Sequence, residues 1–312
     1  MMRSVALLLA LCSSLVLSQL ARAEVQLLTS IKPLQLIAAA VQEGVGQPAV
    51  LLPPGASPHR FALRPSDIRR LREASLFYWV GPDLEGFLGK PLAAREGRSL
   101  ALQSLPGLTL RHFGESAEEH AAHADEHEHP AEHDHDHRPG SIDVHLWLLP
   151  ANARLIAARM ASDLAAIDPA NAARYQANLT AFEARLKQLD QRLQKRLAPL
   201  AGKPFFVFHE TYDYFEQAYG LRHAGVFSLG SEVQPGARHV ADMREQLKAA
   251  GPSCVFSEPP LQPRLAQTLS EGLPVQLAEL DALGSEVAPG PQGYEQLLEG
   301  LAETLASCLQ VD

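Results

Sequence analysis

Cysteine and positive charge are both scarce in this chain. Only three of the 312 residues are cysteines, so a zinc finger built from four thiolates is excluded. Lysine and arginine number 27 against 36 aspartates and glutamates, which gives a formal net charge of −9. A protein of this sign has little with which to neutralise phosphates, so we expect no nucleic-acid partner. Cations are its more natural ligands.

Apolar runs long enough for a bilayer-spanning helix are lacking too. The run Val5–Leu17 is shorter than the roughly 20 residues that such a helix needs. It follows Arg3 and precedes Ala21-Arg22-Ala23, and this order of basic, apolar and small-residue segments is typical of a secretory signal peptide. We therefore expect residues 1–23 to be removed by cleavage after Ala23.

Export would leave two cysteines, Cys254 and Cys308, in an oxidising compartment. Thiols in such a compartment are expected to pair, although two separately buried thiols are the alternative. The bridge would join the last predicted helix to a strand and contribute about 4 kcal/mol through the entropy of the unfolded chain.

Strand and helix patterns alternate along most of the mature chain, and the 46% of hydrophobic residues suffices for a core. Short apolar runs at 25–29, 48–52 and 76–80 are separated by helical patterns that begin near Pro33 and Pro65. The second half repeats this style with strands at 205–208, 224–229, 253–257 and 275–279. Such alternation predicts an α/β fold of two lobes, each a mainly parallel sheet with flanking helices.

One long helix separates the two halves. Apolar residues recur by threes and fours from Tyr175 to Leu197, with Asp168 as the predicted N-cap and Pro169 at the first helical position. At 1.5 Å per residue this helix would span roughly 45 Å, enough for a rigid connector; a coiled-coil dimer is the alternative. We predict an N-terminal lobe at 24–167, the linking helix at 168–199 and a C-terminal lobe at 200–312.

Three histidines occupy comparable places at the ends of predicted strands or ordered segments: His59, His145 and His209. Ligands of open α/β sheets bind outside the carboxyl ends of the strands, which is where His209 lies. A metal held by all three would join the lobes. Taken singly, each histidine is more often an ordinary core or surface residue, and no local spacing links them as in a metalloprotease helix.

A polar insert at 115–138, which lacks the apolar residues of a core, carries seven more histidines among carboxylates. Imidazole suits zinc, copper, nickel and iron, so the insert should bind such ions weakly at several sites. A solvated linker whose histidines form a pH-dependent charge reservoir is the alternative. The histidines of the insert are His120, His123, His127, His129, His133, His135 and His137.

Taken in order along the chain, several motifs resemble the zinc-specific periplasmic binding proteins of bacterial ABC importers. The resemblance covers essentially the whole mature chain and implies a monomer that holds Zn²⁺ between its lobes. It further implies a periplasmic location, no enzymatic activity, and delivery to an inner-membrane permease driven by a cytoplasmic ATPase. The motifs are Ser30-Ile31-Lys32-Pro33, Gly55-Ala56-Ser57-Pro58-His59, Leu63-Arg64-Pro65-Ser66-Asp67, Val80-Gly81-Pro82-Asp83, the histidine-rich insert, His145-Leu146-Trp147, Phe206-Val207-Phe208-His209, Glu232-Val233-Gln234-Pro235-Gly236 and Leu280-Asp281-Ala282-Leu283-Gly284.

Within this resemblance His59, His145 and His209 match the three imidazole ligands, and Asp281 matches an aspartate at or near the site. Some members carry a glutamate where this chain has Pro58, so the fourth ligand is left open among Asp281, a water and a histidine of the insert. The two cysteines of the mature chain match positions that are paired in some members. Because protonated imidazole cannot bind metal, we expect zinc affinity to fall as the pH drops through about 6.5.

Two other functions compete with this interpretation. A zinc-dependent hydrolase also uses three ligands and an open position, and Glu210 beside His209 offers a base, but Asp213 stands where a metalloprotease helix needs its second histidine. A metal buffer or adhesin would bind through the insert alone. Copper or nickel as the true ligand also stays open, because generic affinity rises toward copper.

Overall fold

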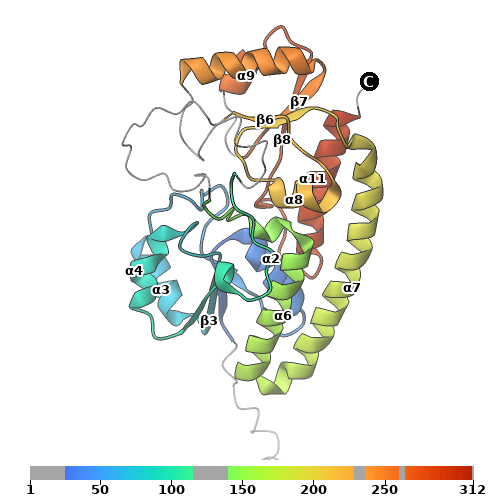
Figure 1. Ribbon diagram of the computed structural model, residues 1–312. Coiled ribbons are helices and arrows are strands. Elements are labelled where there is room, and N and C mark those ends of the chain that lie inside the picture. The colour runs from blue at the N-terminus through green and yellow to red at the C-terminus, as the bar shows by residue number, and fades with distance from the viewer. Residues whose placement is uncertain (1–24, 115–139, 228–235, 260–263, 311–312) are drawn as a thin grey trace, which may run out of the picture.

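The computed structural model describes residues 25–114, 140–227, 236–259 and 264–310 (Figure 1). These residues form two four-stranded sheets, with strand orders β2-β1-β3-β4 and β6-β5-β7-β8, and every pairing is parallel. The predicted α/β class with two lobes is therefore confirmed. The two orders are equivalent, so each lobe places its first strand beside the second and third strands along the chain.

The first sheet comprises β1 (Leu27–Thr29), β2 (Ala49–Val50), β3 (Leu76–Trp79) and β4 (Arg98–Ala101). All side chains of β1 and β3 are buried, as expected for central strands with helices on both faces. The edge strand β4 is only partly buried and lacks an apolar run, which is why sequence patterning missed it. The accompanying helices are α2 (Lys32–Val41), α3 (Pro65–Glu73), α4 (Gly89–Ala93) and α6 (Pro150–Ile167).

The second sheet comprises β5 (Phe205–Val207), β6 (Gly225–Val226), β7 (Ser253–Ser257) and β8 (Val275–Glu279). Its helices are α8 (Asp213–Tyr219), α9 (Ala237–Ala250), α10 (Arg264–Ser270) and α11 (Gly293–Leu309). Cys254 of β7 is bonded to Cys308 of α11, which confirms the predicted disulfide. The bond ties the last helix to the sheet.

The long helix α7 (Ala172–Leu197) runs along one side of the molecule past both lobes (Figure 1). The helical segment begins as predicted, with Asp168 in the N-cap position and Pro169 first, but its first turn, residues 169–171, is 3₁₀ and the α-helix starts at Ala172. The Asp168 carboxylate accepts hydrogen bonds from the side chains of Asn171 and Tyr175, at 2.6 and 3.0 Å, instead of capping the helix. Sequence spacing alone does not reveal this competition.

The two lobes also touch directly. The Trp147 indole donates a hydrogen bond of 2.9 Å to the Ala282 carbonyl, and the Tyr294 hydroxyl donates one of 2.6 Å to the Trp147 carbonyl. One continuous apolar core surrounds the first sheet and extends along α7 and α11 to β5 and β7. A separate, smaller core lies between the second sheet, α9 and α10. Within the described ranges no helix is both long and apolar enough to cross a membrane.

Candidate metal centre

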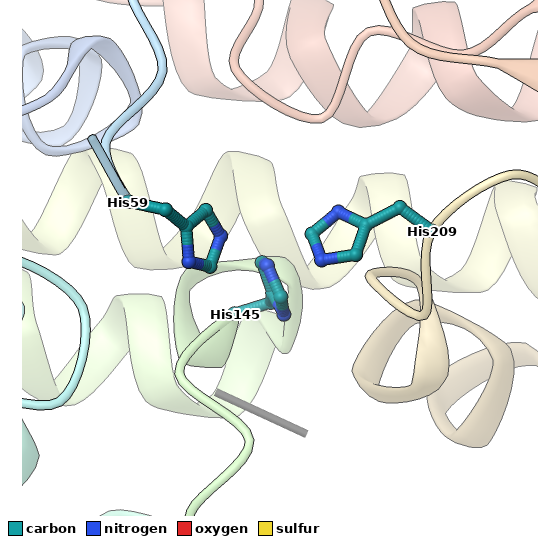
Figure 2. Close-up of side chains that lie close together, drawn as sticks. All are labelled: His59, His145 and His209. Carbon is teal, nitrogen blue, oxygen red and sulfur yellow. The ribbon is translucent and has the colours of Figure 1, made fainter. Parts of the chain in front are cut away.

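The rings of His59, His145 and His209 converge on one point (Figure 2). Their centroids lie 5.2 to 5.7 Å apart, and one nitrogen of each ring lies within 4.8 Å of the others. Tetrahedral zinc with Zn–N bonds of 2.0–2.1 Å holds its ligands about 3.4 Å apart. Small side-chain rotations would thus suffice for the three imidazoles to share one ion.

Each histidine reaches this point from a different part of the chain. His59 lies in the loop between β2 and α3, and His145 directly precedes the 3₁₀ turn Leu146–Leu148. His209 follows β5, at the carboxyl end of a parallel strand, where ligands of such sheets bind. Two of the rings therefore come from the first lobe and one from the second.

Burial limits access of water to the group. His145 is 2% exposed and His209 is 7% exposed, whereas His59 is half-buried. A cation held here is largely removed from solvent, which strengthens its attraction to the donor atoms. His59 is the most accessible ligand candidate of the three.

His145 is oriented by a buried carboxylate. Asp143 Oδ1 lies 2.9 Å from His145 Nδ1 and accepts a second hydrogen bond, of 3.0 Å, from the His145 backbone N–H. Burial raises the pKa of Asp143, and the charge of Asp213 adds to this, while the His145 N–H and Arg111 oppose it. A carboxylate at Nδ1 favours the tautomer that presents Nε2 to a metal.

His209 is oriented by a hydroxyl instead. The Thr211 hydroxyl donates to Glu258 Oε1 at 2.7 Å and lies 2.7 Å from His209 Nδ1. Because the single hydroxyl proton is directed to Glu258, the oxygen accepts from His209 Nδ1–H. The proton on Nδ1 leaves the lone pair on Nε2. Both buried histidines are therefore held in the tautomer that metal ligation requires.

Sequence reasoning missed Glu258, which belongs to this centre. Its Oε1 lies 3.3 Å from His209 Nδ1. Burial favours the neutral acid, but the electrostatic effect of the neighbouring His209 and His59 rings and the hydrogen bond from Thr211 outweigh it, so the pKa of Glu258 is lowered. The residue directly follows β7, and the strand-end rule that selected His209 could have selected it as well.

In the structure the Asp281 side chain is engaged with the backbone of the residues that follow it. Its carboxylate accepts hydrogen bonds from the backbone N–H groups of Leu283, Gly284 and Ser285, at 3.0, 2.9 and 2.6 Å. Asp281 is not among the residues whose ligand atoms converge with those of the three histidines. The aspartate therefore stabilises the turn after β8.

The described residues on either side of the polar insert pair with each other. His112 pairs with Ile142 in an antiparallel bridge, and Asp143 N donates to the Arg111 carbonyl at 2.9 Å. The segment that leaves the insert thus carries both Asp143 and His145. The seven histidines predicted to bind metal weakly lie outside the described residues.

The family model for ZnuA, the periplasmic component A of the zinc-uptake complex, matches residues 27–308. The chain belongs to the ZnuA family. It is 40% identical to the high-affinity zinc uptake system protein ZnuA of Yersinia pestis over 296 residues, covering 92% of each chain. The Brucella abortus (strain 2308) protein of the same name is 36% identical over 318 residues, with 94% of each covered.

Solved structures of the ZnuA family share the fold. A crystal structure of ZnuA superposes with a TM-score of 0.75 at 24% identity, over 92% of this chain and all of that one. A zinc-bound ZnuA from which residues 138–173 are deleted gives a TM-score of 0.74 at 23% identity, over 93% of this chain and 100% of that one. Their two-lobe architecture is the one described above.

Proposed function

We propose that this protein captures Zn²⁺ in the periplasm and delivers it to an ABC permease for high-affinity zinc uptake. The observation that carries the proposal is the convergence of three imidazoles from both lobes of a ZnuA family member. The Yersinia and Brucella relatives are named for zinc uptake, which favours transport over a hydrolase or a metal buffer. Zinc is thus the cargo of the protein.

The donor set supports zinc as that cargo. Three neutral nitrogens suit zinc, whereas calcium and magnesium prefer shells of oxygen. Asp143 and Thr211 prepare the ligands by placing an acceptor at Nδ1 of His145 and His209. Little reorganisation is therefore needed when the ion arrives.

A water molecule is our proposed fourth ligand. The Asp281 carboxylate already accepts backbone hydrogen bonds from three successive residues, and binding the ion would compete with them. Bonds to a charged acceptor contribute about 1.5–3 kcal/mol each, so this exchange is unfavourable. A histidine of the insert could displace the water.

The organisation of the chain follows from the same proposal. Cleavage after Ala23 would release the mature protein, whose N-terminal lobe at 24–167 supplies His59 and His145. The C-terminal lobe at 200–312 supplies His209, and the linking helix at 168–199 sets the spacing of the lobes. A monomer suffices, because one chain holds all three ligand candidates.

Zinc titration of the mature chain tests the proposal. We expect the parent chain to hold one equivalent of zinc that a competing chelator does not remove. The His209→Ala variant should lose this equivalent, and the His239→Ala variant should keep it. His239 is a suitable control, since it lies on α9 and its Nε2 contacts the Phe227 carbonyl. Deletion of 115–138 should remove only weakly bound zinc. Retention of the resistant equivalent in His209→Ala would refute the proposed site.

A further inference from the structure

A second cluster of metal-ligating side chains lies in the C-terminal lobe. Asp213 and Glu216 are on α8, and His223 is in the turn that follows this helix. One ligand atom from each residue lies within 4.8 Å of the other two. Asp213 and Glu216 are buried, at 7% and 4% exposure, and His223 is partly buried.

The backbone places His223 against Glu216. Helix α8 ends at Gly220, whose φ of 68° turns the chain back in the left-handed conformation that glycine adopts readily. His223 N then donates to Glu216 Oε2 at 3.0 Å, and the ring Nδ1 lies 3.0 Å from both carboxylate oxygens. The position of the imidazole is therefore built into the turn.

Asp213 supplies an observation of a different kind. Its Oδ1 accepts a hydrogen bond of 3.0 Å from Arg111 Nη2, but its Oδ2 is buried without a hydrogen-bond partner among the described residues. An unsatisfied buried carboxylate oxygen costs about 1–3 kcal/mol, so native structures rarely keep one without a reason. A cation between Asp213, Glu216 and His223 would satisfy this oxygen.

The cluster brings two buried carboxylates together with one guanidinium and one imidazole. Arg111 Nη2 lies 3.0 Å from Asp213 Oδ1, and His223 Nδ1 lies 3.0 Å from Glu216 Oε1. A divalent ion could supply the positive charge that a protonated His223 would otherwise supply.

We propose that Asp213, Glu216 and His223 form a second divalent-cation site. Two carboxylates and one imidazole suit zinc, cobalt, nickel and manganese, so this site discriminates among them less than three nitrogens do. Arg111 already offsets one carboxylate charge, and the bond between Glu216 and His223 must open when the ion enters. The second site is therefore weaker than the three-histidine centre.

Zinc and cobalt titration in a His209→Ala background tests this site, because that substitution silences the first centre. In native mass spectrometry and calorimetry we expect His223→Gln to lose one equivalent that the His239→Gln control keeps. Asp213→Asn, which can keep its bond to Arg111, should weaken the same equivalent at least tenfold. Thermal melts of the metal-free proteins establish that each variant is folded. If the His223→Gln variant is not folded, the metal affinity of the Asp213→Asn variant tests the site.

Equal stoichiometry and affinity in the folded variants and the control would overturn the proposal and leave the cluster as an ion pair. This failure is distinguishable from failure of the proposed function, which is judged by the chelator-resistant equivalent that the parent chain holds and His209→Ala loses. Either result is thus informative about one site alone.

Discussion

Removal of the Asp143 side chain should weaken zinc binding, although all three histidines are kept. Asp143 is 1% exposed and holds His145 through the ring Nδ1 and the backbone N–H. A hydrogen bond to a charged acceptor contributes about 1.5–3 kcal/mol, and each 1.36 kcal/mol is a factor of ten. Asp143→Ala should therefore lower zinc affinity roughly 10- to 100-fold, the range known for carboxylates that orient metal-bound histidines.

Asp143→Asn separates charge from geometry, because the amide oxygen can still accept from the imidazole. We expect it to lose less than Asp143→Ala. Asp163→Ala is the matched control: Asp163 is a buried aspartate of α6 that bonds to Tyr78 and Arg159. That variant should lose stability but keep its zinc affinity.

Competition with a chelator of known affinity measures these constants, and thermal melts in the absence of zinc show that each variant is folded. If folded Asp143→Ala binds zinc within roughly threefold of the parent, orientation of His145 by this carboxylate does not contribute, and the reasoning is wrong.

Three further predictions concern stability. The Cys254–Cys308 bond joins residues 54 positions apart in the sequence. Its reduction, or replacement of both cysteines by serine, should lower the unfolding free energy by about 4 kcal/mol in denaturant titrations, and an unchanged value would contradict this. Glu85 is fully buried, and burial raises its pKa from 4.5 to about 7 despite the hydrogen bond of 3.0 Å that its carboxylate accepts from the Gly81 backbone N–H. The folded state thus binds the extra proton between these pH values, so stability should fall by roughly 3 kcal/mol as the pH rises through this window, and Glu85→Gln should flatten that part of the profile. Arg192→Ala should cost under about 1 kcal/mol, because the ion pair of Arg192 is solvent-exposed. Arg185→Ala should lower the unfolding free energy by about 1–3 kcal/mol, because it leaves the buried Glu295 carboxylate without its ion-pair partner. Equal melting temperatures for the two arginine variants would contradict this.

Local patterns predicted the bounds of several elements, among them the fully buried strand β7 and the mostly exposed strand β8. The apolar strands at 253–257 and 275–279 and the helix at 150–167 have the predicted bounds. Patterning failed at β4 and α4, which lie at the edge of the first sheet and have mixed exposure. At the start of the long helix Asp168 is in the predicted N-cap position, but its carboxylate bonds to the side chains of Asn171 and Tyr175 and not to the helix backbone.

The three histidines could be predicted as ligand candidates from their chemistry and their positions at strand ends. The residues that hydrogen-bond to them could not be predicted in this way. Asp143 and Thr211 are each two residues from the imidazole that they orient, and neither spacing forms a recognised motif. Glu258 lies 49 positions beyond His209 in the numbering and reaches it only because β5 and β7 are neighbours in the sheet. Asp281 was a candidate by resemblance, and its hydrogen bonds to the turn became visible only in three dimensions.

The sequence by itself determined the α/β class, the long helix and the supply of imidazoles, since each depends on residue type and on spacing within one element. Tertiary structure alone decided that His59, His145 and His209 meet. Their rings are carried by loops, and the positions of loops are set by long-range packing, such as the bond from Trp147 to Ala282 that ties one lobe to the other. Packing of this kind joins residues far apart in the chain, and no local period records it.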